Sequence, residues 1–412
     1  HRAFDLMNKH RAIPLLVNQN ITIPQFHIQG LISLVNKMPF DDTPPLTMAQ
    51  IDEIDRMTSH LHHRKLKGHA ITEVDQIESL PMEELDLARA LLLYQFQDSP
   101  DKMHQIKEYE ANLDMMAMQI LARIPRSASN LEKIRAINHF IFHEMRFRFP
   151  PQSLSNKEID TFTFLPSVLD SRLGVCLGVS ILYLTLAQRM DLELEIFTPP
   201  GHIYLSYVDV DGNRLNIETT ARGIHIPQEQ YFGMNTISLK QRTLRETIGL
   251  SFFNQASVMW HHEDYEAAVK LYRLALPFMT NDPLLHLFLG INLLNIGEEK
   301  EGREHLEFVT KNPIEEIVFQ DTLSQDYLAG KASKEGLNAI FKDVDETRSS
   351  IFEKQKELQE ALDQSPEFRE GWMALAVTWL QLSRLKEALA ALERYHELDP
   401  NNPTVEYYLS MV

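Results

Sequence analysis

The chain has 412 residues, of which 44% are hydrophobic and 24% charged, a composition typical of a soluble globular protein. Its formal net charge of −18 argues against nucleic acid and anionic membranes as partners, because both bind through basic patches. One hydrophobic core rarely serves a chain of this length, so two or three domains are expected. A single cysteine excludes an internal disulfide and any zinc site built on several cysteines.

The sequence shows no segment suited to crossing a membrane. The longest uncharged apolar run, residues 174–187, is shorter than the roughly 20 residues that span a bilayer. No signal peptide is visible, but a chain that begins with His1 instead of methionine would not show an export signal lying upstream. The compartment therefore stays open, with the cytoplasm favoured.

Residues 1–75 form an N-terminal extension whose fold the sequence does not define. Residues 21–28 alternate as in a short strand, and residues 49–64 have helical spacing. Imidazole is a common ligand of zinc and nickel, and four histidines cluster at this point: His60, His62, His63 and His69. Adjacent histidines cannot all face one ion, and no acid or thiol beside them completes a set. We therefore predict an exposed helix end here, with no metal and no cofactor.

Residues 76–246 form the second predicted domain, which begins with helices. Apolar residues recur at helical spacing over 85–93 and 106–124. Ser129 with a glutamate three residues later predicts the start of the next helix through a capping box. A further helical stretch is expected around residues 165–169, and another over 177–190.

The pattern then changes to period two, which predicts strands at 192–197, 202–210 and 214–218. Residues 211–213 read Asp-Gly-Asn, a hairpin turn, because glycine and asparagine tolerate positive φ. Helices followed by a small antiparallel sheet predict an α+β domain.

The lone cysteine, Cys176, stands where a loop passes into the predicted helix at 177–190. A thiolate is the nucleophilic form of cysteine, and the N-terminal end of a helix favours an anion. The backbone N–H of Cys176 is a natural donor to an oxyanion. Weaker candidates for a second donor are Asn156, Thr161 and Thr163.

A histidine and an acid follow in the order that a cysteine nucleophile requires. His202 precedes the second predicted strand, so its imidazole can face the helix end and accept the thiol proton. Glu218, at the end of the next strand, would hold that imidazole in one tautomer. Asn216 lies on the same side of the strand and is an alternative for this role, so the choice between them stays open.

Residues 85–223 resemble the transglutaminase-like (papain-like) superfamily, specifically its SirB-like bacterial branch. The resemblance rests on these residues: 113–114, Asn138 with 141–142, 164–174, 180–184, 187–190, 200–202 and 218–223. It implies a papain-like fold and the order cysteine, histidine, acid. Members of the wider superfamily carry an aspartate about sixteen residues after the histidine, where this chain has glutamate. Many relatives in the branch have lost the cysteine, which this chain keeps.

Residues 247–412 form the third predicted domain, an all-α solenoid. Small residues stand 34 positions apart at Ala268 and Gly302, and the clearest copy of the pattern runs from Trp372 to Pro400. This spacing is similar to that of tetratricopeptide repeats. Residues 314–350 fit the pattern poorly. The predicted fold class is thus α+β, a papain/transglutaminase-like domain followed by a repeat solenoid.

Two functions are compatible with this organisation. The first is a cysteine-dependent acyl-transfer enzyme, acting as a hydrolase (protease or amidase) or as a transglutaminase, whose repeats recruit a protein substrate. The second is a catalytically inactive scaffold whose repeats bind protein partners. Solenoids bind peptides along their concave surface, and the exposed residues expected there are Asn292, Asn295, Arg303, Tyr272 and Lys270.

Overall fold

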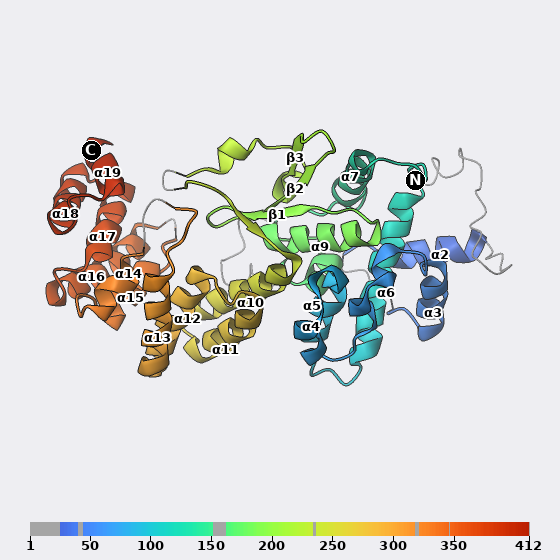
Figure 1. Ribbon diagram of the computed structural model, residues 1–412, viewed down its shortest axis with the longest axis horizontal. Helices are drawn as coiled ribbons and strands as arrows, with labels where there is room; N and C mark the ends of the chain where they lie inside the picture. The colour runs from blue at the N-terminus through green and yellow to red at the C-terminus, as the bar shows by residue number, and fades with distance from the viewer. Residues whose placement is uncertain are drawn as a thin grey trace. The chain divides into compact units, whose positions relative to one another are not determined.

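A computed structural model describes residues 25–39, 44–150, 162–233, 236–317, 321–345 and 347–411 (Figure 1). The chain forms two compact units. The first comprises His1–Arg148, Leu165–Gly174 and Ile181–Leu194, and the second comprises Phe149–Phe164, Val175–Ser180 and Glu195–Val412. No helix among the described residues is both long and apolar enough to cross a bilayer.

The first unit is helical. Its α-helices are α2 (Gln25–Val35), α3 (Met48–Met57), α4 (Asp75–Ser79), α5 (Leu87–Gln95), α6 (Lys102–Leu121), α7 (Asn130–Asn138) and α8 (Leu165–Ser171). Short 3₁₀ turns are η1 (His62–Lys65), η2 (Lys67–Ala70) and η3 (Met82–Glu84), and a π-helical turn, η4 (His139–Glu144), follows α7.

Local signals located most of these helices correctly. The capping box at α7 is present, since Ser129 Oγ accepts from the Glu132 N–H at 3.3 Å and Glu132 Oε2 accepts from the Ser129 N–H at 2.7 Å. The strand predicted at 21–28 is wrong where the structure describes it, because residues 25–28 begin α2; residues 21–24 lie outside the described residues. Leu31 and Val35, one helical turn apart, are the buried contacts of α2 and favour the helix.

A buried ion network centred on Asp114 of α6 holds the first unit together. The Asp114 carboxylate is fully buried and accepts hydrogen bonds from Arg189 Nε at 2.7 Å, Arg64 Nε at 3.1 Å and Thr58 Oγ1 at 3.1 Å. Burial alone would raise the pKa of Asp114, but Arg189, His63 and Arg64 hold that pKa far below its usual range. The network therefore depends on Asp114 remaining ionised.

Replacing Asp114 with asparagine keeps the side-chain volume and removes the charge, which leaves two arginines facing a neutral group. We expect Asp114→Asn to lower the free energy of unfolding by about 3–5 kcal/mol, measured by urea denaturation. The matched control is Asp52→Asn on exposed α3 surface, which should change stability by less than about 0.5 kcal/mol. Equal effects of the two substitutions would contradict this role for Asp114.

The second unit contains a small antiparallel sheet that follows helix α9 (Cys176–Arg189) along the chain. Its strands are β1 (Glu195–Thr198), β2 (Tyr204–Val208), β3 (Arg214–Ile217) and β4 (Lys240–Arg242), in the order β3-β2-β1-β4. Two 3₁₀ turns, η6 (Thr219–Ala221) and η7 (Gln228–Tyr231), lie between β3 and β4. In the predicted hairpin turn Gly212 has φ +83°, a backbone conformation that glycine adopts easily.

The sheet core is aromatic. Phe197 of β1 pairs with Tyr204 of β2 in the antiparallel register, and both rings are buried with Leu239. The sequence predicted three strands and missed β4, whose residues Lys240–Arg242 are charged or polar. β4 pairs with β1 at the edge of the sheet, and local periodicity does not reveal such a long-range partner.

The remainder of the second unit is a succession of helices. They are α10 (Leu244–His261), α11 (Tyr265–Ala275), η8 (Leu276–Phe278), α12 (Pro283–Asn295), α13 (Glu299–Lys311), α14 (Leu323–Leu328), α15 (Lys334–Phe341), α16 (Arg348–Gln364), α17 (Arg369–Gln381), α18 (Leu385–Leu398) and α19 (Pro403–Met411). The predicted fold class, α+β followed by helical repeats, is confirmed. The poorly fitting segment 314–350 contains the two shortest of these α-helices.

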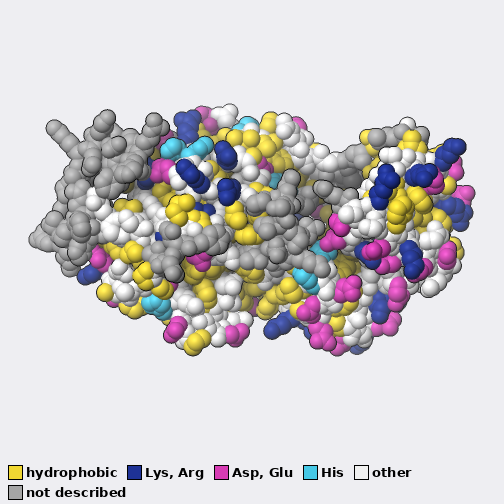
Figure 2. Space-filling view, turned by 180° about the vertical axis from the view of Figure 1, so that it is seen from behind, with side chains coloured by type: hydrophobic (Ala, Val, Ile, Leu, Met, Phe, Trp, Pro, Cys, Tyr) yellow, Lys and Arg dark blue, Asp and Glu magenta, His cyan; other side chains and the backbone are white. Residues whose placement is uncertain are grey.

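A short bridge joins the sheet region to the repeats within the second unit. Thr236 pairs with Ile317, and the Ile237 N–H donates to the Glu316 carbonyl at 2.8 Å. On the face shown in Figure 2, acidic and basic side chains lie interspersed over the repeat helices nearest the C-terminus. Although the chain has a net charge of −18, the acidic side chains over these helices do not form a single acidic patch on that face.

Helices α12 and α13 cross where two glycines meet. A Cβ built on Gly302 would lie 2.9 Å from the Gly290 carbonyl oxygen and 2.9 Å from Leu294 Cδ2. We expect Gly302→Val to force these helices apart and lower the free energy of unfolding by about 1–3 kcal/mol. Glu304→Val, on the exposed side of the same helix, controls for helix propensity and should cost less than about 1 kcal/mol in thermal or urea unfolding. A smaller loss for Gly302→Val than for Glu304→Val would argue against this close crossing.

Candidate active site

Cys176 is the first residue of α9 and is partly exposed. The Val175 N–H donates to the Phe162 carbonyl at 3.2 Å, and the Val175 carbonyl accepts from the Val179 N–H at 3.0 Å. These two bonds fix the chain where it enters the helix. The first N–H groups of a helix have no partner within it, so an anion at this position is stabilised by both hydrogen bonding and the helix dipole.

His202 lies in the turn before β2. Its N–H donates to the Pro199 carbonyl at 3.0 Å, and Gly201 in the same turn has φ +69°, which favours glycine. Cys176 and Glu218 are the two side chains that raise the pKa of His202, and the His202 Nε2 lies 2.8 Å from Glu218 Oε2. Nδ1 is thus the ring nitrogen that does not face the carboxylate.

The Glu218 carboxylate is nearly buried and has three further contacts. Its Oε1 accepts from the Thr220 N–H at 3.1 Å and from Thr220 Oγ1 at 2.5 Å. Its Oε2 accepts from the Tyr231 hydroxyl at 2.8 Å, as well as facing His202. Hydrogen bonds from donors on the η6 and η7 turns thus hold both carboxylate oxygens, and the Glu218 side chain has little freedom to rotate.

These contacts shift the titration of both groups. Burial opposes charging of His202, but hydrogen bonds to Cys176 and Glu218 outweigh it and raise the pKa of His202 to about 10. Burial likewise opposes ionisation of Glu218, but bonds from His202, Thr220 and Tyr231 lower the pKa of Glu218. The imidazolium–carboxylate pair is therefore the form present at neutral pH.

Tyr231 is a member of this cluster that the sequence analysis did not identify. Its ring stacks on the buried Tyr204 ring with centroids 4.1 Å apart, and it stacks more loosely on the His202 ring at 6.0 Å. The sheet core thereby aims the Tyr231 hydroxyl at Glu218. Tyr231 lies in a loop segment without strand or helix periodicity, so only the fold reveals its position.

Asn216, the alternative to Glu218, points elsewhere. Its Oδ1 accepts from Ser206 Oγ at 2.9 Å, and its Nδ2 donates to the Ile226 carbonyl at 2.8 Å. Among the candidate oxyanion donors, Thr163 is buried and accepts from Asn254 Nδ2 at 2.7 Å. Asn156 and Thr161 lie outside the described residues.

The residues expected to line an exposed peptide groove do not all reach the surface. Tyr272 and Asn292 are fully buried, so neither can line such a groove. The Asn295 side chain exchanges hydrogen bonds with that of Asn338 at 2.9 and 2.8 Å. Arg303 lies over the Tyr327 ring at 5.7 Å, and Lys270 is exposed. Each helix of a repeat turns some residues toward the core and others toward the surface, and the repeat spacing alone did not identify which residues are buried.

The histidine cluster near residue 60 is also arranged differently from the exposed helix end predicted there. α3 ends at Met57, and the histidines continue into the turns η1 and η2. His63 is fully buried, and His69 Nδ1 lies 3.0 Å from Asp86 Oδ2. An acid from a later segment therefore joins these histidines.

Replacing Glu218 with glutamine removes the negative partner of His202. We expect Glu218→Gln to lower the pKa of His202 from about 10 toward its ordinary value of 6.5, measured by NMR titration of the imidazole proton. The signal is assigned by its loss in His202→Ala. The exposed neighbour Glu229, changed to glutamine, should leave the titration unchanged.

The same pair predicts how stability depends on pH. A raised folded-state pKa at His202 gives stability that is complete below pH 6.5 and is lost as the pH rises toward about 10. A lowered folded-state pKa at Glu218 gives stability above pH 4.5 that is lost in acid. The stability gap between wild type and Glu218→Gln should therefore be largest between pH 4.5 and 6.5. A gap that grows toward pH 10 would contradict the assignment.

Two family models match parts of this chain. The transglutaminase-like superfamily matches residues 107–247, and a tetratricopeptide repeat matches residues 355–403. No curated protein gives a significant match.

Among solved structures, the chain is similar to one titled "Crystal structure of menin reveals the binding site for Mixed Lineage Leukemia (MLL) protein". The identity is 11%, with 90% of this chain and 93% of that chain covered, and the TM-score is 0.36. A similarity this low supports no statement about the fold or the partners of this chain.

The SirB-like branch stays a prediction. Residues 107–247 are a domain of the transglutaminase-like superfamily, and residues 355–403, C-terminal to it, are a tetratricopeptide repeat.

Proposed function

We propose that this chain is a cysteine-dependent acyl-transfer enzyme with Cys176 as nucleophile, His202 as proton shuttle and Glu218 as the group that orients the imidazole. The observation that carries the proposal is the position of His202, whose Nε2 lies 2.8 Å from Glu218 Oε2 and whose pKa is raised by both Cys176 and Glu218. Support also comes from the match of the surrounding residues to the transglutaminase-like superfamily. Asn216 is left out of the proposed triad, because its amide bonds to Ser206 and Ile226.

In the proposed resting enzyme the thiol proton is already on His202 as the imidazolium, so the first half-reaction begins when the Cys176 thiolate attacks an amide carbonyl carbon and a C–S bond forms as the C=O π bond opens. The charge that develops on the carbonyl oxygen is stabilised by the Cys176 N–H at the start of α9. The imidazolium then gives its proton to the leaving amine as the C–N bond breaks, and a thioester remains. The high pKa of His202 favours the imidazolium form, which is the form that donates the proton to the leaving amine.

In the second half-reaction the now neutral His202 removes a proton from the incoming nucleophile, which attacks the thioester carbonyl; the C–S bond breaks and the Cys176 thiolate is released beside the regenerated imidazolium. Water gives hydrolysis, as in a protease or amidase, and a primary amine gives transglutamination. We propose hydrolysis as the simpler outcome, because no described residue marks a second site for an amine.

The repeats are proposed to recruit the substrate. Tetratricopeptide repeats are modules of protein–protein interaction, and one matches residues 355–403. A protein or peptide is accordingly the proposed substrate class. The alternative function, a scaffold with an inactive transglutaminase-like domain, shares this binding role and differs only at Cys176.

Labelling of Cys176 distinguishes the two functions. With an acyl-type cysteine probe and mass spectrometry, we expect Cys176 to react at least about tenfold faster than free cysteine at a pH well below about 8.5. His202→Ala should abolish that advantage, whereas His60→Ala, at an exposed position, should not. If Cys176 reacts at the rate of free cysteine and His202→Ala changes nothing, the scaffold function is the correct one.

A further inference from the structure

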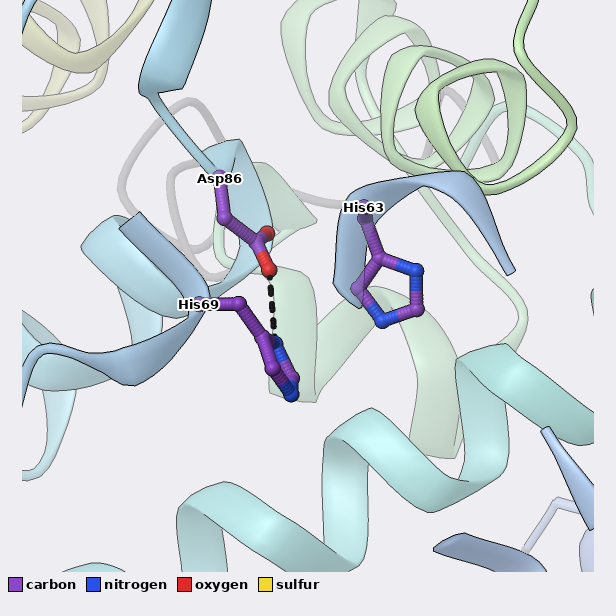
Figure 3. Close-up of side chains that lie close together, drawn as sticks. All are labelled: His63, His69 and Asp86. Atoms are coloured by element: carbon purple, nitrogen blue, oxygen red, sulfur yellow. Dashed lines mark hydrogen bonds and ion pairs between the residues drawn. The ribbon is translucent and has the colours of Figure 1, made fainter. Parts of the chain in front are cut away.

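Two histidines and an aspartate lie together in the first unit, outside the regions matched by the family models (Figure 3). His63 comes from η1 and His69 from η2, while Asp86 directly precedes α5. One donor atom from each residue lies within 4.8 Å of the other two. Figure 3 shows the His63 ring beside His69, with one ring nitrogen turned toward it.

The His63 imidazole is buried and only partly satisfied. It is fully inaccessible to solvent, and its Nε2 lies 3.2 Å from Asp114 Oδ1, an ion-pair contact without the geometry of a hydrogen bond. Its Nδ1 makes no hydrogen bond. Buried polar groups in folded proteins are almost always satisfied, so this imidazole has capacity for a further partner.

Among the described residues no lysine or arginine forms an ion pair with Asp86, although Arg189 and Arg89 lie near enough to interact with it electrostatically. The Asp86 Oδ2 lies 3.0 Å from His69 Nδ1, and its Oδ1 accepts the Arg89 backbone N–H at 3.2 Å. The arginine side chains nearby already face other acids: Arg64 faces Asp55 and Asp114, Arg189 faces Asp114, and Arg89 faces Glu110.

Backbone packing holds the donors in place. A Cβ on Gly68 would lie 2.5 Å from the Asp86 backbone nitrogen and 2.6 Å from the Glu84 carbonyl oxygen. The turn η2 therefore lies directly against the chain that enters α5, and only glycine at position 68 permits this approach. His69 is held beside Asp86 as a result.

We propose that His63, His69 and Asp86 bind a divalent transition metal, with Zn²⁺ as the ion best suited to two imidazoles and one carboxylate. In a tetrahedral zinc site the metal–ligand distances are about 2.0–2.2 Å, so donor atoms lie about 3.3–3.6 Å apart. The donor atoms lie within 4.8 Å of one another, so binding of the ion would draw them about 1 Å closer together. A water molecule would fill the fourth position, and the ion would cross-link η1, η2 and the start of α5.

The test is zinc binding by the full chain. The purified protein is titrated with Zn²⁺ against a chromophoric chelator, and its metal content is measured by plasma mass spectrometry after removal of free ions. We expect about one zinc per chain. Two variants, His69→Gln and Asp86→Asn, should lose this equivalent while circular dichroism shows a folded chain. Asparagine keeps an oxygen to accept the Arg89 N–H, so Asp86→Asn retains the helix cap.

His60→Ala serves as the matched control, because His60 is exposed and lies outside the cluster. It should bind zinc as the wild type does. Replacement of zinc by Co²⁺ should give visible absorption bands of a tetrahedral site in the wild type and not in His69→Gln. A wild-type chain that takes up no zinc in the titration, or variants that bind it as tightly as the wild type, would overturn the proposal. The site is separate from Cys176, so neither result bears on acyl transfer.

Discussion

The carboxylate of Glu218 is the constraint on which the proposed active site depends. It serves as a common acceptor for His202 ahead of β2, Thr220 in η6 and Tyr231 in η7. A nearly buried carboxylate is costly unless each of its lone pairs is occupied, so these three segments are held in one arrangement. The orientation of the imidazole toward Cys176 follows from that arrangement.

Glutamate stands at the position where the resemblance described in the sequence analysis implies an aspartate. The backbone of Glu218 is tied down by its own N–H, which donates to the Ile224 carbonyl at 3.0 Å, and by the Gly223 N–H, which donates to the Glu218 carbonyl at 2.8 Å. With the main chain fixed, the longer side chain spans the distance to His202. Thr220 on one oxygen and Tyr231 on the other then limit the freedom that the extra methylene brings.

The parts of the fold that could be predicted are those encoded by short-range signals. The capping box at Ser129, the Asp-Gly-Asn turn and the helix after Cys176 each depend on neighbours within a few residues. Strand β4 and the burial of Tyr272 and Asn292 depend on tertiary contacts, and local periodicity does not identify the residues that make those contacts. The same limit applies to the sites. The order of Cys176, His202 and Glu218 is visible as a motif, whereas Tyr231 and Asp86 enter their clusters only through tertiary packing.

The bridge between Thr236 and Ile317 joins the chain that follows η7 to the chain that follows α13. Thr236 closely follows η7, the turn that carries Tyr231, and Ile317 closely follows α13 of the repeats. The backbone bonds at Thr236 and Ile237 therefore tie the sheet region to the chain that follows α13 within the second unit, two segments that lie about 80 residues apart in the sequence.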